Sequence, residues 1–326
     1  MMMRTNRKMS RRRFLRITGL AGFGAASLSL LDHGIAAEAS VPAWTWRGVV
    51  MGADASVSLH GLSEAKASRL TLGCFEELRR LEKLFSLYDP DSAVCRLNRQ
   101  GYLLDPPPEL VRLLLEARSF SKQTGGAFDV SVQPLWVGLR DHFKRTPTPP
   151  PATLLRELLV NVDYRGIQVS RRRIAFRRSG MAVTLNGIAQ GWITDRIAEY
   201  LQREGVSSTL INIGEYRALG MHPENRPWRL GVRGSDGADD LLDTVPLEQA
   251  ALAVSGGHGH PFADLPGAHH LVHPRTGLCQ PTRRTIALVA RTATEADALS
   301  TACAVVDDEA ASGFARDRAV RLRLFS

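Results

Sequence analysis

Segments with strand character occur in groups, with helical stretches between the groups, and this arrangement restricts the possible folds. Residues 49–60 alternate apolar and polar side chains from Ala55 onward, which predicts a half-buried strand. Further strands are expected at residues 166–170, 173–177, 181–185, 209–213, 228–232, 252–255, 285–290 and 320–325. Because helices do not alternate strictly with these strands, the sequence predicts an α+β fold with a mixed, largely antiparallel sheet.

The expected helices and one proline-rich connector suggest how the chain is divided. Helices are expected at residues 63–84, 109–123, 188–203 and 295–306. The connector, Thr146-Pro-Thr-Pro-Pro-Pro151, is a stiff surface segment and a seam between subdomains. Since candidate site residues lie on both sides of it, we expect a single domain over residues 40–326, at most two interlocked subdomains.

The first 39 residues have the parts of an export signal. Ser10-Arg-Arg-Arg-Phe-Leu15 is a twin-arginine pattern, a weakly apolar run covers residues 17–31, and Ala37-Glu-Ala39 is a small-residue cleavage site. We therefore expect a twin-arginine signal peptide at residues 1–39 and a mature chain that starts near Ser40. The expected location is the bacterial periplasm, with association to the inner membrane if the signal is retained.

The charge of the chain argues against a nucleic-acid partner. Residues 1–39 carry seven of the 42 Lys and Arg and two of the 33 Asp and Glu, so +5 of the formal net charge of +9 belongs to the signal. The remaining charge of about +4 suits anionic small molecules better than nucleic acid. The four cysteines form no CxxC pair, and we expect all of them to be buried or inert.

A carboxylate and two hydroxyls share one helix face near the C-terminus. Asp297 and Thr301 are four residues apart and Ser300 lies beside that face. An oxygen-only set favours magnesium over zinc, and magnesium needs few protein ligands when phosphates complete its shell. The alternative is that Asp297 only complements the positive end of the helix dipole.

Two glycine-containing segments are candidates for ligand contact. Thr184-Leu-Asn-Gly-Ile-Ala-Gln-Gly191 leads into a helix, whose N-terminus attracts anions, and its glycines allow close backbone approach. Thr124-Gly-Gly-Ala-Phe-Asp129 can present backbone amides and one carboxylate. The alternatives are an ordinary tight turn and a simple helix stop.

Five of the nine histidines lie within residues 258–273, namely His258, His260, His269, His270 and His273. This cluster has three readings: a transition-metal site, one general base among bystanders, or a polar loop. His270 is the best candidate base, because it should end a short strand just before the rigid turn Pro274-Arg-Thr-Gly277. Tyr88, which follows the first helix, either stacks on a flat ring or packs in a turn.

These segments together resemble the ApbE family of FAD:protein FMN transferases. The resemblance covers nearly all of the chain after the signal and implies an ApbE-like (T-fold-like) α+β fold. The matching blocks, in order, are Met51-Gly52, Phe85-Ser-Leu-Tyr-Asp-Pro-Asp-Ser92 with Leu97-Asn98, Thr124-Gly-Gly-Ala-Phe-Asp129 with Pro134-Leu135, Thr184-Leu-Asn-Gly-Ile-Ala-Gln-Gly191, Ile211-Asn-Ile-Gly214, Ser255-Gly-Gly257, His270-Leu-Val-His-Pro-Arg-Thr-Gly277 and Asp297-Ala-Leu-Ser-Thr301.

The resemblance implies a magnesium-dependent transfer of FMN from FAD to a Ser or Thr hydroxyl of a partner protein, with a phosphoester formed and AMP released. It implies that the metal is held by Asp297, Thr301, Ser300 and the carbonyl of Gly187, and that His270 is the catalytic base. The residues implied for FAD binding are Met51, Tyr88, Ala127, Phe128, Asp129, Thr184 and Gln190.

The chain departs from the pattern of the family at three positions. Gln190 stands where the family commonly has Lys, and His273 stands where it commonly has Asp before Pro. Glu215 follows Gly214 where the family has a second glycine. The implied metal residues are all present.

The resemblance also implies the kind of partner. The acceptor would be an exported domain of a membrane redox complex: the sodium-pumping quinone reductase, the Rnf electron-transfer complex or the flavoprotein linked to nitrous oxide reduction. Two alternatives use the same residues differently. Water could replace the acceptor, which makes the protein an FAD pyrophosphatase giving FMN and AMP, or the protein could bind FAD or a metal without turnover.

Overall fold

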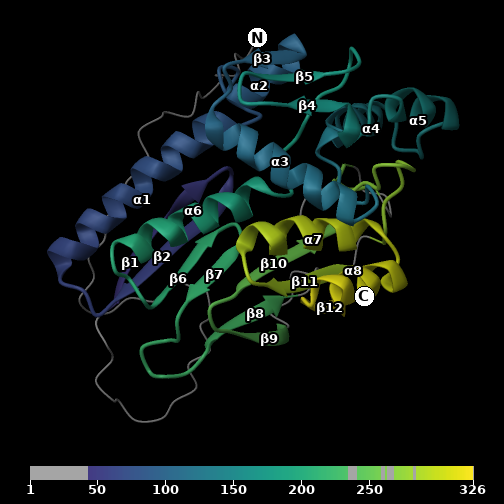
Figure 1. Ribbon diagram of the computed structural model, residues 1–326. Coiled ribbons are helices and arrows are strands. Elements are labelled where there is room, and N and C mark those ends of the chain that lie inside the picture. Colours follow the sequence, from purple (N-terminus) through teal and green to yellow (C-terminus); the bar gives the residue numbers. More distant parts are fainter. Residues whose placement is uncertain (1–42, 234–240, 258–260, 263–267, 282–283, 326) are drawn as a thin grey trace, which may run out of the picture.

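The computed structural model describes residues 43–233, 241–257, 261–262, 268–281 and 284–325. Its largest element is a seven-stranded sheet in the order β1-β2-β6-β7-β10-β11-β12, in which every neighbouring pair is antiparallel (Figure 1). Its strands are β1 (Ala43–Val50), β2 (Ala53–His60), β6 (Thr209–Ile213), β7 (Tyr216–Leu219), β10 (Ala251–Gly256), β11 (Thr285–Ala290) and β12 (Arg321–Phe325).

The two faces of this sheet are covered differently. Helices α1 (Glu64–Phe85), α6 (Ala189–Arg203) and α7 (Ala293–Val305) pack along one face, with α8 (Asp308–Arg318) beside α7 (Figure 1). The other face packs against the hairpin of β8 (Trp228–Arg233) and β9 (Leu241–Leu247). Period-two alternation in β11 explains this division, because Ile286 and Leu288 face the helices while Ala287 and Val289 face the hairpin.

A smaller sheet lies at the end of the molecule formed by α2 and α3 (Figure 1). It has the order β3-β5-β4 and is antiparallel throughout. Its strands are β3 (Tyr102–Leu104), β4 (Ile167–Val169) and β5 (Arg173–Phe176). The surrounding helices are α2 (Ala93–Gln100), α3 (Pro108–Gln123), α4 (Gln133–Arg145), α5 (Ala152–Leu159) and the short 3₁₀ helices η1 (Val130–Val132) and η2 (Tyr164–Gly166).

The predicted α+β class with antiparallel sheets is confirmed. The strand predicted at residues 181–185 is wrong, because this segment forms no strand. The side chain of Asn98 satisfies it instead: Nδ2 donates to the Val183 carbonyl at 2.8 Å, and Oδ1 accepts the Val183 N–H at 2.7 Å. Residues 49–60 belong to two strands, joined by a turn in which Met51 and Gly52 both have positive φ (49° and 82°).

Two further observations bear on the composition-based expectations. All four cysteines are free, and burial raises the pKa of the Cys74 and Cys303 thiols to about 12, so these two are unreactive as expected. Within the described residues, no helix combines the length and the apolar character that crossing a membrane requires. The expected signal at residues 1–39 lies outside the described residues.

Candidate active site

The N-terminal part of α6 and the first turn of α7 meet at Gly191. The Gly191 N–H donates to Asp297 Oδ2 at 3.0 Å. A Cβ at Gly191 would lie 2.3 Å from the Ala293 carbonyl oxygen and 2.8 Å from Asp297 Cβ, so only glycine permits this approach. The segment 184–191 and the Asp297 helix, 106 residues apart in sequence, are therefore joined at one point.

The carboxylate of Asp195, on α6, accepts hydrogen bonds from the start of α7. Its Oδ1 accepts the Ala293 N–H at 2.9 Å, and its Oδ2 accepts the Thr294 N–H at 2.8 Å and the Thr294 hydroxyl at 2.6 Å. These are donors at the N-terminus of α7, where a buried carboxylate also complements the helix dipole. The N-cap residue Thr292, whose Oγ1 accepts the Glu295 N–H at 3.2 Å, and Asp195 together satisfy the donors at the start of α7, so Asp297 is not needed for that role.

Gly187 lies against Thr301 on the exposed side of the junction. A Cβ at Gly187 would be 2.9 Å from Thr301 Oγ1 and 3.4 Å from Phe128 Cε2. The segment 184–187 is fixed nearby, since the Thr184 N–H donates to the Val130 carbonyl at 2.8 Å and Thr184 Oγ1 accepts the Asn186 N–H at 3.2 Å. Gly187, Thr301 and Asp297 therefore place a peptide, a hydroxyl and a carboxylate at one junction.

Ser300 is fully buried and links α7 to the sheet. Its hydroxyl donates to the Asp297 carbonyl at 3.0 Å and lies 2.8 Å from Ser255 Oγ on β10. Two of its hydrogen-bonding positions are therefore in use. Its structural role is to fix the helix turn that carries Asp297 and Thr301.

The junction also contains two interacting buried carboxyls. Burial raises the pKa of Asp297 to about 7, against the lowering effect of the Gly191 N–H. Burial, and secondly the charge of Asp297, hold the pKa of Glu215 well above its usual range, although Glu215 accepts a hydrogen bond from the backbone of Val254. Two carboxyls that repel each other in a buried site are stabilised by a cation or a shared proton.

Gln190, another of the family departures, lies close to Glu215. Gly214, with φ of +92°, packs so closely on the Gln190 side chain that a Cβ would lie 2.6 Å from Gln190 Cδ and Nε2. Thr194 Oγ1 donates to the Gln190 carbonyl at 2.8 Å and lies 3.4 Å from the Glu215 carbonyl oxygen. The neutral amide of Gln190 and the acid Glu215 thus belong to one local arrangement.

The donors at the junction are all oxygen atoms. Within the described residues, no group of three or more His, Cys, Asp and Glu side chains is arranged to hold a metal ion. The oxygen atoms of the junction, which include the Asp297 carboxylate and the Thr301 hydroxyl, fit a hard cation such as magnesium and not zinc or copper. The histidine cluster, for which a transition-metal site was one of three interpretations, falls partly outside the described residues, which exclude His258 and His260.

The other expected FAD residues lie in three loops, which are the β1–β2 turn, the bend after α1 with Tyr88 and the loop between α3 and η1. Ala127 and Phe128 are buried, and the Phe128 N–H donates to Thr124 Oγ1 at 3.1 Å. Met51 sits in the β1–β2 turn, where its N–H donates to Glu82 Oε1 at 3.0 Å. Phe128 reaches the junction directly, since it touches the position of Gly187.

Asp129 has a structural role in the described contacts. Its Oδ1 accepts from the Ser131 N–H at 2.8 Å and the Ser131 hydroxyl at 2.6 Å, and its Oδ2 accepts the Tyr164 N–H at 3.0 Å. Burial raises its pKa in spite of these donors. Asp129 thereby fixes the turn that presents Phe128.

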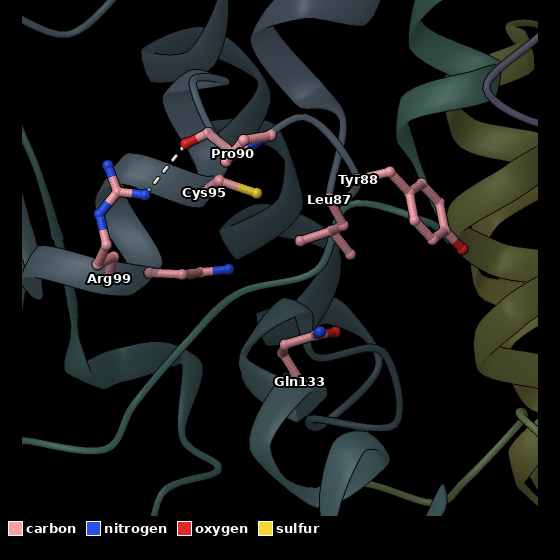
Figure 2. Close-up of a pocket in the computed structure, with 7 residues that line it drawn as sticks. Leu87, Tyr88, Pro90, Cys95, Arg99 and Gln133 are labelled. Carbon is pink, nitrogen blue, oxygen red and sulfur yellow. Dashed lines mark hydrogen bonds between the residues drawn. The ribbon is translucent and has the colours of Figure 1, made fainter. Parts of the chain in front are cut away.

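Tyr88 borders an open cavity of about 460 Å³ whose lining is Leu87, Tyr88, Pro90, Cys95, Asn98, Arg99 and Gln133. The Tyr88 side chain is 87% exposed, and Figure 2 shows its ring pointing away from Cys95 and Arg99. The ring is exposed and can stack on a planar ligand. The alternative interpretation, in which Tyr88 packs inside a turn, is therefore wrong.

The two adjacent histidines of the 268–281 segment differ in environment. His269 is 1% exposed, its Nε2 lies 2.8 Å from the Gln280 carbonyl oxygen, and its ring packs on Gly257 at the end of β10. His270 is less buried, and its ring centroid is 6.3 Å from that of His269. His270 lies in a bend and not at the end of a strand, so that detail of the prediction is wrong.

The turn after His270 has the predicted form. The His273 carbonyl accepts the N–H groups of Thr276 (3.3 Å) and Gly277 (2.9 Å), and Gly277 has a φ of +72°. His273 Nδ1 accepts the Arg275 N–H at 3.1 Å, which is the bond that an Asp side chain makes two residues before its partner. The departure at His273 therefore preserves the turn.

Two contributors were not identified from the sequence. Asp195 gave no signal, since an acid within a helix is normally solvated, and its capping role depends on the packing of α6 against α7. Glu215 was recognised only as a departure from the family. Its position after Asn212-Ile-Gly214, at the end of β6, was the available clue that it could face the junction.

The fold and the junction define an α+β protein that can hold a hard cation beside an anionic ligand. The profile of the ApbE family matches residues 51–324. The chain is 26% identical over 287 residues to an FAD:protein FMN transferase of Klebsiella pneumoniae, covering 83% of this chain and 81% of the relative. It is 28% identical over 270 residues to one of Treponema pallidum, covering 74% and 73%.

Solved structures agree in fold. The flavin transferase ApbE from Vibrio cholerae superposes with a TM-score of 0.74 at 22% identity, covering 87% of this chain and 94% of that one. The flavinyl transferase ApbE of Pseudomonas stutzeri, in its apo form, superposes with a TM-score of 0.71 at 23% identity, covering 87% and 92%. The chain belongs to the ApbE family.

Proposed function

We propose that this protein transfers FMN from FAD to a Ser or Thr hydroxyl of an exported partner protein and needs magnesium to do so. The curated relatives are named FAD:protein FMN transferases, and the chain covers more than seven tenths of their length. The observation that carries the proposal is the junction itself. The hydrogen bond from Gly191 to Asp297 and the contact of Gly187 with Thr301 place an anion-attracting helix start beside an oxygen donor set.

The proposed magnesium site consists of Asp297, Thr301 and the Gly187 carbonyl, with Ser300 beside them. Magnesium bound there would neutralise charge on the diphosphate of FAD. Glu215 adds a second carboxyl close to Asp297, which increases the preference of the site for a cation. The proposed FAD surface extends from this point along Phe128, Ala127, Asp129, Thr184 and Gln190 to Met51 and Tyr88.

In the proposed reaction, the oxygen of the acceptor hydroxyl attacks the phosphorus of the FMN half of FAD. The bond from that phosphorus to the bridging oxygen breaks, and AMP leaves with the oxygen. His270 takes the proton of the hydroxyl as the new phosphoester bond forms. Tyr88 stacks on a planar part of the dinucleotide, and Gln190 contacts FAD without adding charge.

We propose the periplasm as the site of action, with a domain of a membrane redox complex as the acceptor. The support is the twin-arginine pattern at the N-terminus and the family membership of the chain. Domains of the sodium-pumping quinone reductase, of the Rnf complex and of the nitrous-oxide-linked flavoprotein are the acceptors to test.

The decisive experiment is incubation with FAD, magnesium and each acceptor domain, followed by denaturing electrophoresis. We expect a fluorescent band at the mass of the acceptor that survives acid, and no band when the acceptor hydroxyl is replaced by Ala. His270→Ala should abolish the band while FAD binding remains. Thr301→Val, which keeps the shape of the side chain, should raise the magnesium concentration needed.

The same experiment separates the other two functions. Release of AMP at full rate without any acceptor would replace the transferase with an FAD pyrophosphatase. Bound FAD with neither AMP release nor a labelled acceptor would show that the protein binds FAD without turnover. Either result contradicts the proposal.

A further inference from the structure

One surface at the end of the molecule is strongly basic. Residues 164–194 contain six arginines and no Asp or Glu, whereas residues 40–326 as a whole have a net charge of about +4. Without this segment the remainder of that chain would be slightly acidic. The six arginines are all exposed and lie on η2, on the β4–β5 hairpin and just after it: Arg165, Arg171, Arg172, Arg173, Arg177 and Arg178.

Few carboxylates neutralise this surface. Asp163 pairs with Arg165 at 2.8 Å and lies 3.8 Å from Arg178. Asp105 also lies beside the hairpin, since its N–H donates to the Arg172 carbonyl at 2.9 Å. Arg96 and Arg99 on the neighbouring α2 are exposed and add further positive charge.

Exposed apolar side chains are interleaved with these arginines. On β3, Tyr102 and Leu104 are 43% and 59% exposed, while Leu103 between them is buried. Leu104 pairs in register with Arg173, and the Arg173 guanidinium lies 5.6 Å from the centre of the Tyr102 ring. The outer face of the small sheet therefore combines cations with a tyrosine and a leucine.

We propose that this face of the β3-β5-β4 sheet docks on an anionic lipid surface. Arginines beside a membrane are attracted to anionic headgroups, and their long stems cover apolar surface while the guanidinium stays wet. Tyrosine is favoured at the depth of the headgroups. The sheet forms one end of the molecule, away from the β8–β9 hairpin, so it can meet a planar surface (Figure 1).

Docking here would place the active-site junction near the membrane. Asn98 of α2 holds Val183, and the junction segment begins at the next residue. The inference does not depend on the proposed transfer reaction, since lipid binding is measured without FAD or acceptor. The two can therefore fail separately.

The test is co-sedimentation of the full chain with vesicles of phosphatidylglycerol and phosphatidylethanolamine. We expect binding that needs phosphatidylglycerol and weakens with added salt. The triple variant Arg171→Gln/Arg172→Gln/Arg177→Gln should lower the partition constant roughly 100-fold, since each basic side chain beside an anionic leaflet contributes about a fivefold factor.

A matched variant controls for net charge. Arg118→Gln/Arg229→Gln/Arg316→Gln removes three exposed arginines elsewhere on the surface and should bind nearly as the unchanged chain does. All three proteins keep residues 1–42, so any contribution of that segment is common to them. Equal melting temperatures would show that both variants fold.

Hydrogen exchange gives a local readout of the same binding. Phosphatidylglycerol vesicles should slow exchange at residues 164–178 and leave the β8–β9 hairpin unchanged. Equal loss of binding in both triple variants, equal binding to neutral vesicles, or unchanged exchange at residues 164–178 would overturn the proposal. Capture of an acidic protein by this face without lipid binding would also overturn it.

Discussion

Asp297 is a buried carboxyl that lowers the stability of the metal-free protein. It is 3% exposed, and burial raises its pKa from 3.8 to about 7. Because the native carboxyl binds its proton more tightly than the unfolded one, stability falls as pH rises from about 4 to about 7. Above that range the native state holds an ionised buried carboxylate, and a bound cation would offset this cost.

Asp297→Asn should therefore stabilise the protein and remove its response to magnesium. In a chelator at about pH 8, we expect the free energy of unfolding to increase by up to about 4 kcal/mol, because burial raises the pKa of Asp297 from 3.8 to about 7 and each tenfold change in proton affinity corresponds to about 1.4 kcal/mol. Asparagine can still accept the Gly191 N–H. Urea denaturation with and without magnesium measures both effects.

Asp195→Asn is the matched control for that substitution. Asp195 lies on the neighbouring helix and is also buried, but both of its oxygens accept N–H groups of α7. An amide can accept on only one side, so this variant should lose about 2 kcal/mol. Stability changes of the same sign in the two variants would contradict the different roles assigned to these acids.

The two glycines of the junction should respond differently to alanine. A Cβ at Gly191 meets backbone at 2.3 Å, whereas a Cβ at Gly187 meets the Thr301 side chain at 2.9 Å. Gly191→Ala should cost more than about 3 kcal/mol of stability, because backbone must shift. Gly187→Ala should cost about 1 kcal/mol and weaken magnesium binding by displacing the Thr301 hydroxyl.

Calorimetry of magnesium binding and thermal denaturation of both variants check this difference. Gly313→Ala is the control, since nothing lies within 4 Å of a Cβ there and the residue is inside α8. That change should raise stability by about 0.5–1 kcal/mol through helix propensity. Normal magnesium binding by Gly187→Ala would argue against the proposed ligand set.

At the scale of elements, the turn after His270 depends on a neutral histidine. Burial, and secondly Arg275, lower the pKa of His273, which leaves Nδ1 free to accept the Arg275 N–H. The native state therefore binds fewer protons at this site than the unfolded state, so stability falls as pH drops below about 6.5. Protonation would remove the acceptor and loosen the turn.

His273→Asp should remove that part of the pH dependence. The carboxylate accepts the same N–H and stays ionised across the titration range of histidine. We expect the melting temperature of the variant to fall less than that of the unchanged chain between neutral pH and about pH 5. His273→Ala, which has no acceptor, should be less stable at both values. An unchanged slope in His273→Asp would place the titration elsewhere.

Periodicity predicted most of the larger elements, because their apolar residues follow their burial. The strands β6 and β11 were predicted with their actual bounds, and α6 began one residue after the expected start. The segment 181–185 has strand-like composition, but its backbone bonds go to the Asn98 amide and to Val130. Such a partner is set by tertiary packing, which the local pattern does not contain.

The spacing of residues predicted part of the geometry of the candidate site. Spacing on α7 brought together Asp297, Ser300 and Thr301, and the structure places Gly187 against Thr301 and Gly191 against Asp297. Spacing alone could not show that Asp195 already caps this helix, which is why dipole complementation remained an alternative for Asp297. The resemblance to the family supplied the residues that no local pattern connects.

At the scale of the whole molecule, both sheets share one hydrophobic core. A single cluster of buried side chains contains Leu103 and Ile174 of the small sheet together with Val57, Ile211 and Ile286 of the large one. The proline-rich connector at 146–151 leads only from α4 to α5 and does not separate these sheets. Composition marked that connector correctly, but only packing shows what it joins.

This continuity predicts a single cooperative unfolding transition, which magnesium and FAD should shift together. The proposed FAD residues Tyr88 and Phe128 precede the connector, whereas Asp297 follows it, so a bound dinucleotide would span the shared core. A ligand that binds only the native state raises its stability with concentration. Magnesium should therefore raise the melting temperature more in the presence of FAD than alone. Calorimetry that resolves two transitions would mean that the small sheet unfolds independently. Shifts of the melting temperature by the two ligands that merely add would mean that the FAD site lies on one side of the connector.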